Sequence, residues 1–309
     1  MPEHRLGELP PVQVHTDPEG REFGFVHVRH PGARGLAVHF SAFFGAWGDA
    51  RPYRDQFQGY FHRLKMLGHD PGRNWLFLCD AYGAYDNGTY YTGRAGDLFV
   101  ERAMTAIIEA HLDDFGYRDQ ALVTLGSSMG ATAALKFGLD LDADGIVAIC
   151  PHIDLDVCAR EQDRRAEVAW ICPDGDPFAE HNHRLTRQVS ARLASRPADR
   201  PLPRLFVQSC EDDHGVHEEQ VVPLVERWRS RGGEVVADFR PVGGHTSDWA
   251  TRAVLLDAVD RLADGRPIDV DRYRDDPAYV GRITTPPVTH RLRRAASLTR
   301  KRVRAAVGR

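Results

Sequence analysis

One serine in this sequence lies where a nucleophile could be presented. Residues 126–130 read Gly-Ser-Ser-Met-Gly; an apolar run precedes them, and good helix formers follow at residues 131–137. A strand, G-x-S-x-G and a helix in that order predict a tight turn that lifts the central serine above the sheet edge, at the positive end of the helix. Glycine suits both ends of this turn because larger side chains would collide with the flanking strand and helix. We therefore predict that Ser128 is a nucleophile; the alternative is a Gly-Ser turn that only connects two elements.

A serine hydroxyl is a poor nucleophile until a base removes its proton, so the chain must also supply a histidine and an acid. In a site of this kind the acid and then the histidine follow the serine along the chain. His245 and the acidic run 211–213 both come shortly after predicted strands, where open parallel sheets place their active sites. His245 is the predicted general base and Asp213 the acid that orients it, with Asp212 as a rival that the pattern does not separate. The alternatives are a helix-capping histidine and a solvated acidic loop.

Acyl transfer also needs hydrogen-bond donors for the negatively charged oxygen of a tetrahedral intermediate, each worth roughly 3–4 kcal/mol. The backbone N–H of Met129, directly after the serine, is the expected first donor. The second is expected from the loop after the third predicted strand, which reads Ser-Ala-Phe-Phe-Gly-Ala-Trp-Gly over residues 41–48. Phe43 or Phe44 is the predicted second donor; the alternative is that these aromatics form an apolar wall.

A loop rich in tyrosine follows the fourth predicted strand and extends over residues 80–93. It is expected at the same sheet edge as the nucleophile. Tyrosine has an apolar ring that can stack on a sugar face and a hydroxyl that can bond to it. We therefore predict that Asp80, Tyr82, Tyr85 and Tyr90 bind substrate as a sugar platform. A lid packed on its own aromatics is the alternative.

Two pairs of histidines could bind a metal ion: His181 with His183, and His214 with His217. Neither pair has the i, i+4 helical spacing or the accompanying Cys or Glu of a strong zinc signal. Ordinary loop histidines are expected, and the sequence predicts neither a metal nor another cofactor.

The order of the predicted elements indicates an α/β domain. Two segments that alternate like antiparallel strands come first, and apolar strands that alternate with helices follow. The predicted strands are Val12–His15, Glu22–Val28, Leu36–Phe40, Trp75–Cys79, Ala121–Leu125, Gly145–Cys150, Arg204–Cys210 and Val235–Phe239. The predicted helices are Leu98–Leu112, Ala131–Phe137, one around Val221–Arg229, and one that begins after Thr246 or Ser247. A mostly parallel central sheet flanked by helices is therefore expected over residues 11–264, with a polar, weakly periodic insertion or cap at about 152–200.

Charge divides the chain unevenly. The net charge is −4, yet nine of the 40 basic residues and no acidic residue lie between Arg282 and Arg309. The remainder holds 31 basic and 44 acidic residues, and such an acidic body argues against nucleic-acid binding. Within residues 265–309, the first part to about 287 has the prolines of a linker, and residues 289–309 predict a basic amphipathic helix for an anionic membrane surface or an acidic partner. A solvated, partly disordered terminus is the alternative.

The composition is that of an ordinary globular protein, with 42% apolar and 27% charged residues in a chain of 309. No stretch approaches the roughly 20 apolar residues that cross a bilayer, and the first residues lack the apolar core of a secretory signal. The five cysteines are an odd number, and three of them belong to apolar segments where a buried thiol is the usual state. We therefore expect a cytoplasmic protein without disulfides, either free or peripheral to the membrane.

The loop at residues 80–93, the helix after it and the run Gly126–Leu135 together resemble the α/β-hydrolase-like proteins of bacterial surface-glycan systems. That group includes the accessory secretion-system glycan O-acetyltransferases and related capsule-biosynthesis proteins. The resemblance covers roughly residues 75–250. The insertion at 152–200 and the basic tail are not part of it.

The resemblance implies an α/β-hydrolase fold and a serine esterase or acyltransferase. Its triad would be Ser128, Asp213 (or Asp212) and His245, acting on a small acyl ester or a glycan. Two alternatives stand beside it. One is a scaffold in a glycan-assembly complex that keeps the fold without chemistry, and the other is a peptidase or lipase.

Overall fold

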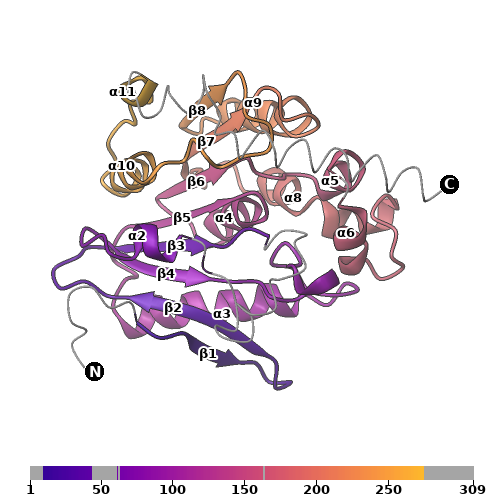
Figure 1. Ribbon diagram of the computed structural model, residues 1–309, viewed down its shortest axis with the longest axis horizontal. Helices are drawn as coiled ribbons and strands as arrows, with labels where there is room; N and C mark the ends of the chain where they lie inside the picture. The colour runs from indigo at the N-terminus through magenta and orange to yellow at the C-terminus, as the bar shows by residue number, and fades with distance from the viewer. Residues whose placement is uncertain (1–9, 44–60, 62, 163, 275–309) are drawn as a thin grey trace, which may run out of the picture. The chain divides into compact units, whose positions relative to one another are not determined.

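Eight strands form one mixed sheet in the described part of the chain (Figure 1). The structure is a computed structural model and describes residues 10–43, 61, 63–162 and 164–274. The strands are β1 (Gln13–Thr16), β2 (Glu22–Val28), β3 (Leu36–Phe40), β4 (Asn74–Leu78), β5 (Leu122–Ser127), β6 (Gly145–Ile149), β7 (Arg204–Cys210) and β8 (Val235–Arg240). They lie in the order β1-β2-β4-β3-β5-β6-β7-β8; the β1–β2 and β2–β4 pairs are antiparallel and the other pairs are parallel. The predicted α/β architecture with a mostly parallel sheet is confirmed.

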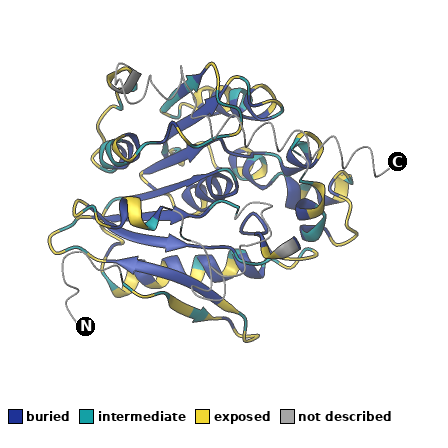
Figure 2. Cartoon of the chain, viewed as in Figure 1, coloured by how far each residue is buried: buried dark blue, intermediate teal, exposed yellow. Residues whose placement is uncertain are grey.

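The central strands are buried on both faces. Every residue of β3, β4, β5 and β6 is buried, as the dark strands in Figure 2 show. Strands covered on both faces must be apolar throughout, which is why these segments are recognisable in the sequence as continuous apolar runs. The predicted strand bounds differ from the observed ones by at most two residues.

Helices cover the two faces of the sheet. α3 (Phe99–Asp114), α4 (Met129–Asp140) and α9 (Val222–Ser230) pack on one face, where their apolar side chains join the main core together with Ile146 of β6. Neighbouring residues of a strand point to opposite faces. Gly145, the neighbour of Ile146, faces α10 (Arg252–Ala263) on the other side, where an added Cβ would lie 2.4 Å from Leu262 Cβ. A short helix, α2 (Leu64–Leu67), contacts α10.

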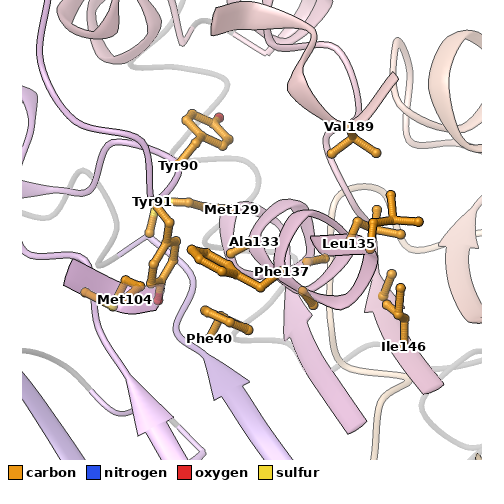
Figure 3. Packing of buried hydrophobic residues seen from close by; sticks show 14 of the residues in the cluster. Phe40, Tyr90, Tyr91, Met104, Met129, Ala133, Leu135, Phe137, Ile146 and Val189 are labelled. Atoms are coloured by element: carbon orange, nitrogen blue, oxygen red, sulfur yellow. The ribbon is translucent and has the colours of Figure 1, made fainter. Parts of the chain in front are cut away.

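Aromatic side chains fix α4 against the strand ends. Phe40 of β3 stacks on Phe137 of α4 with ring centroids 5.0 Å apart, and Tyr91 meets Phe40 edge-on at 5.2 Å. Figure 3 shows these rings packed beside Met129, the first residue of α4. Burial of one such ring contributes roughly 1.5–3 kcal/mol. The packing therefore fixes the position of the helix whose first turn follows Ser128.

The segment at 152–200, predicted as a polar, weakly periodic insertion or cap, is largely helical. It contains α5 (Leu155–Glu161), α6 (Arg165–Ile171), the 3-10 turn η2 (Glu180–Asn182), α7 (His183–Thr186) and α8 (Gln188–Ser195). Each of these helices buries only a few apolar side chains. Helices this short repeat the apolar pattern once or twice, which is too little for a periodic signal.

The predicted start of the last helix is wrong by about five residues. α10 begins at Arg252, and Thr251 caps it by accepting a hydrogen bond from the N–H of Val254 at 3.4 Å. The chain between β8 and α10 is therefore a loop of residues 241–251. A π-helical turn, η3 (His217–Val221), precedes α9, whose predicted position is confirmed.

The chain divides into two compact units, Met1–Ile268 and Asp269–Arg309. The second contains α11 (Asp271–Arg274), and the predicted basic amphipathic helix at 289–309 lies outside the described residues. Among the residues that the structure describes, no helix is both long and apolar enough to cross a membrane.

Candidate active site

Ser128 forms the turn between β5 and α4. Its backbone has φ 53° and ψ −121°, a conformation that non-glycine residues rarely adopt and that costs roughly 1–3 kcal/mol. Its N–H donates to the carbonyl of Ile149 in β6 at 2.8 Å, which ties the turn to the neighbouring strand. The turn is therefore held in a strained conformation by the surrounding sheet.

The two glycines that flank this turn allow close approach of backbone segments. A Cβ at Gly126 would lie 2.2 Å from the carbonyl oxygen of Gly130. A Cβ at Gly130 would lie 2.1 Å from the carbonyl oxygen of Phe40 in β3. Both distances are far below van der Waals contact, so the strand, turn and helix fit together only with glycine at both positions.

The structure brings Ser128, His245 and Asp213 together in series. The Oγ of Ser128 lies 2.8 Å from His245 Nε2, and His245 Nδ1 lies 2.8 Å from Asp213 Oδ2. Asp213 is buried, with 2% of its side chain exposed, whereas 24% of the His245 side chain is exposed. At these distances the imidazole can accept the proton of the hydroxyl, while the carboxylate holds the ring in place and stabilises its charged form.

The two candidate acids have different partners. Asp213 contacts the imidazole, and Gln162 Nε2 donates to its second oxygen at 3.1 Å. Asp212 instead accepts the backbone N–H of Gly244 at 2.6 Å. Asp213 thus orients the histidine ring, while Asp212 holds the backbone just before it.

The predicted oxyanion donors are only partly described. Met129 is the first residue of α4, so its N–H has no carbonyl acceptor within the helix. Phe43 lies two residues beyond the Ser41 that follows β3, and its ring meets the Tyr90 ring edge-on at 5.1 Å. Phe44 lies outside the described residues.

Solved structures of other proteins have a fold similar to that of this chain. The Glycosylation Associate Protein (Gap123) complex from Streptococcus agalactiae gives a TM-score of 0.59 at 16% identity, over 81% of this chain and 45% of that one. The capsule O-acetyltransferase of Neisseria meningitidis serogroup A gives 0.58 at 16% identity, over 77% and 91%. A variant of the esterase rPPE gives 0.54 at 15% identity, over 86% of each chain. The chain has an α/β-hydrolase fold.

At 15–16% identity these likenesses show the fold and not the activity. This chain spans less than half the length of the Streptococcus chain that it resembles. No family model and no curated protein sequence matches it.

In this α/β-hydrolase fold the loop at 80–93 uses its polar groups internally, which corrects the prediction for Asp80 and Tyr90. Asp80 is fully buried and accepts backbone N–H groups from residues 82, 89 and 91. Tyr90 is also fully buried, so its ring has no free face for a sugar. Tyr82 donates its hydroxyl to the carbonyl of Glu22, and the Tyr85 side chain lies outside the described residues.

A buried arginine lies beside the turn at Ser128. Arg63 is 3% exposed and donates from Nη1 to the Oγ of Ser127 at 2.6 Å. Burial lowers the pKa of its guanidinium to about 10, so it carries a positive charge at neutral pH. Sequence reasoning missed Arg63, because no motif or periodic pattern surrounds it.

His152 is a second residue that sequence reasoning missed. It follows β6, and its ring stacks on the ring of His245 with centroids 4.7 Å apart. It is 1% exposed, and burial is the main reason why its pKa lies well below the ordinary value. A single histidine in a loop gives no pattern, so only the folded chain identifies its partner.

The four histidines considered as metal ligands have other partners or lie apart. His181 pairs with Asp174 through Nε2, and buried His217 shares a hydrogen bond with Ser209. His214 is exposed. Within residues 10–43, 61, 63–162 and 164–274, no group of three or more His, Cys, Asp or Glu side chains is placed to hold a metal ion.

Proposed function

We propose that this protein catalyses acyl transfer or ester hydrolysis with Ser128 as nucleophile, His245 as general base and Asp213 as the acid that orients the base. One observation carries the proposal: a hydroxyl, an imidazole and a buried carboxylate joined in series by two contacts of 2.8 Å. A hydroxyl, an imidazole and a carboxylate in the same hydrogen-bonded series activate serine in unrelated proteins. The strained turn at Ser128 adds support, because such strain concentrates at functional sites.

The geometry supports a two-step reaction. His245 Nε2 takes the proton of Ser128 as Oγ attacks the ester carbonyl, and Asp213 stabilises the imidazolium that forms. The N–H of Met129 and a second N–H, from Phe43 or Phe44, receive the oxyanion. The tetrahedral intermediate then collapses: the carbon–oxygen bond of the ester breaks, and the imidazolium returns its proton to the leaving alcohol. Water, or a sugar hydroxyl, then gives a proton to His245 Nε2 as it attacks the acyl carbon; the bond from this carbon to Ser128 Oγ breaks, and the imidazolium returns the proton to Oγ.

For the substrate we propose an acyl group carried by a glycan or by a small ester. Two structural neighbours support the glycan: one is named a capsule O-acetyltransferase and the other a glycosylation-associated complex. An esterase among the neighbours supports the small ester. The fully buried Tyr90 and Tyr91 give no added support to a sugar platform.

A panel of acyl esters, assayed with and without sugar acceptors, tests the proposal. Ser128→Ala should lower turnover by roughly 10⁴-fold or more, because no other group in the triad can form the acyl intermediate. Ser230→Ala is the matched control: this exposed serine of α9 donates its hydroxyl to a backbone carbonyl of its own helix and has no other side-chain hydrogen bond within the part of the chain that the structure describes. Near-normal turnover by Ser128→Ala contradicts the proposal, and acyl products on the sugar rather than free acid identify a transferase.

A further inference from the structure

A second histidine packs face to face on the proposed general base. The rings of His152 and His245 have centroids 4.7 Å apart and lie within 4° of parallel. His152 is 1% exposed, whereas the side chain of His245 is 24% exposed. His152 is therefore the buried member of a stacked pair whose other member contacts Ser128.

Contacts from two other elements hold His152 in place, and one of them is itself bonded to α5. The Tyr90 hydroxyl, from the loop after β4, lies 3.3 Å from His152 Nδ1 and 3.0 Å from the Sγ of Cys158 in α5. Thr132 of α4 donates its hydroxyl to the backbone carbonyl of His152 at 2.7 Å. His152 is thus held at its backbone carbonyl and at one ring nitrogen.

The second ring nitrogen of His152 contributes no hydrogen bond to the fold. This nitrogen, Nε2, is buried and has no hydrogen-bond partner among the described residues. A buried nitrogen without a partner costs stability that a phenyl ring would not. Chains keep such locally unfavourable choices mainly at functional sites, and this one touches the proposed base.

The stacked pair must not carry two positive charges. His245 becomes an imidazolium during acyl transfer, and a second cation against its face would oppose that step. Burial, together with the charges of His245 and Arg164, lowers the pKa of His152 well below its ordinary value, so its ring is neutral at neutral pH. The Tyr90 hydroxyl beside His152 and the Cys158 thiol that contacts this hydroxyl are also neutral there, because burial raises the pKa of both groups.

We propose that His152 is a positioning residue: its neutral ring holds the His245 imidazole by parallel stacking, with Nδ1 on Asp213 and Nε2 on Ser128. The inference rests on the proposed function. His152 acts through His245 and not on the substrate.

The test compares His152→Ala, which removes the ring, with His152→Phe, which restores a stacking ring without nitrogens. We expect His152→Ala to lower kcat about 10- to 100-fold while KM changes less than about threefold, because a misplacement of about 1 Å can cost this much. His152→Phe should recover most of the loss. Tyr90→Phe removes only the hydroxyl beside Nδ1 and should lower kcat about fivefold. Each variant is assayed below its own melting temperature.

A merely structural role for His152 predicts other results. It predicts a lower melting temperature with kcat within twofold of wild type in His152→Ala, or a His152→Phe variant as slow as His152→Ala, and either result overturns the inference. Fluorophosphonate labelling of Ser128 separates this failure from failure of the proposed function. If the wild type labels and the His152 variants label at the same rate, only the positioning role is lost. If the wild type does not label, both are lost.

Discussion

Two loops at the same edge of the sheet use polar residues in opposite ways. The loop after β4, residues 80–93, turns its polar groups inward: Asp80 is fully buried and accepts three backbone N–H groups of its own loop. The loop after β8, residues 241–251, leaves 24% of the His245 side chain exposed, with one ring nitrogen on the acid and the other on the serine. A polar group whose hydrogen bonds are met inside the protein stabilises a loop, whereas an accessible imidazole between two partners can move a proton.

The loop at 80–93 helps to fix the position of the loop at 241–251 through a buried network. Lys136 of α4, 1% exposed, donates to the carbonyls of Tyr90 and Tyr91, both of which have φ near 55°. Glu101 of α3 pairs with Lys136 at 2.8 Å and balances its charge. This buried network holds Tyr90 where its hydroxyl meets the residue stacked on His245. The comparison shows that the same residue types either stabilise a loop or form a site, according to whether their hydrogen bonds are made within the loop or leave a polar group accessible.

The largest effect should come from the acid that serves the accessible loop. Asp213→Asn keeps the shape of the side chain but presents an amide where the imidazole N–H needs a carboxylate. We expect kcat to fall roughly 10³- to 10⁴-fold. Asp212→Asn is the matched control, because among the described residues its carboxylate accepts only the Gly244 N–H, and it should lower kcat less than about tenfold. Steady-state rates on one acyl ester measure both, and equal losses in the two variants would show that the acid is wrongly assigned.

Substitutions in the loop at 80–93 should lower the free energy of unfolding rather than the rate of catalysis. Asp80→Ala removes an acceptor of several buried hydrogen bonds and should lower the free energy of unfolding by roughly 3 kcal/mol. Thr89→Ala removes one donor to Asp80 and the acceptor of the Thr92 N–H, and should cost less, about 1–2 kcal/mol. Urea denaturation measures both. The comparison breaks if Asp80→Ala unfolds like the wild type yet loses as much kcat as Asp213→Asn.

A buried histidine, in contrast to the accessible His245, makes the stability of the fold depend on pH. His27 of β2 is 6% exposed and packs against the rings of His111 and Phe115. Burial, followed by the charges of His111 and Arg29, lowers its pKa to about 3. The unfolded chain, in which histidine has a pKa near 6.5, binds a proton that the folded chain does not. Stability is therefore highest above about pH 6.5 and is lost as the pH falls toward 3.

Each pH unit inside this window should cost about 1.4 kcal/mol for one such histidine. Denaturation curves at pH 7 and pH 4.5 measure the loss in the wild type and in His27→Phe, which keeps a buried ring but does not titrate. The wild type should lose about 2–3 kcal/mol more than the variant. The same loss in both proteins would mean that His27 does not govern the acid limit.

The sequence predicts most of the sheet and two of the three residues of the proposed triad. Buried parallel strands such as β6 are apolar throughout, so their bounds are visible without any long-range information. Ser128 is marked by the two glycines that its turn requires, and His245 by its place after the last strand. Asp212 and Asp213 are not separable in this way, because the direction of a side chain in an irregular loop depends on packing that the sequence does not encode locally.

The residues that sequence reasoning missed depend on contacts between distant segments. His152 meets a ring that is 93 positions further along the chain, and Gln162 reaches an acid in the loop after β7. Arg63, which directly precedes α2, reaches Ser127 of β5. The error for Asp80 and Tyr90 has the opposite cause: polar and aromatic residues near a site suggest a binding surface, although here they are buried by their own loop. The basic helix at 289–309, the second oxyanion donor and the glycan remain predictions.

The central claim is that His245 makes Ser128 nucleophilic, and the rate of fluorophosphonate labelling measures it most directly. Labelling is followed by mass spectrometry of the intact chain and of its peptides, in the wild type and in His245→Gln. We expect the wild type to take up one label, on Ser128, and His245→Gln to label at least about 100-fold more slowly. Equal rates in the two proteins, or a label on any other residue, would contradict the account.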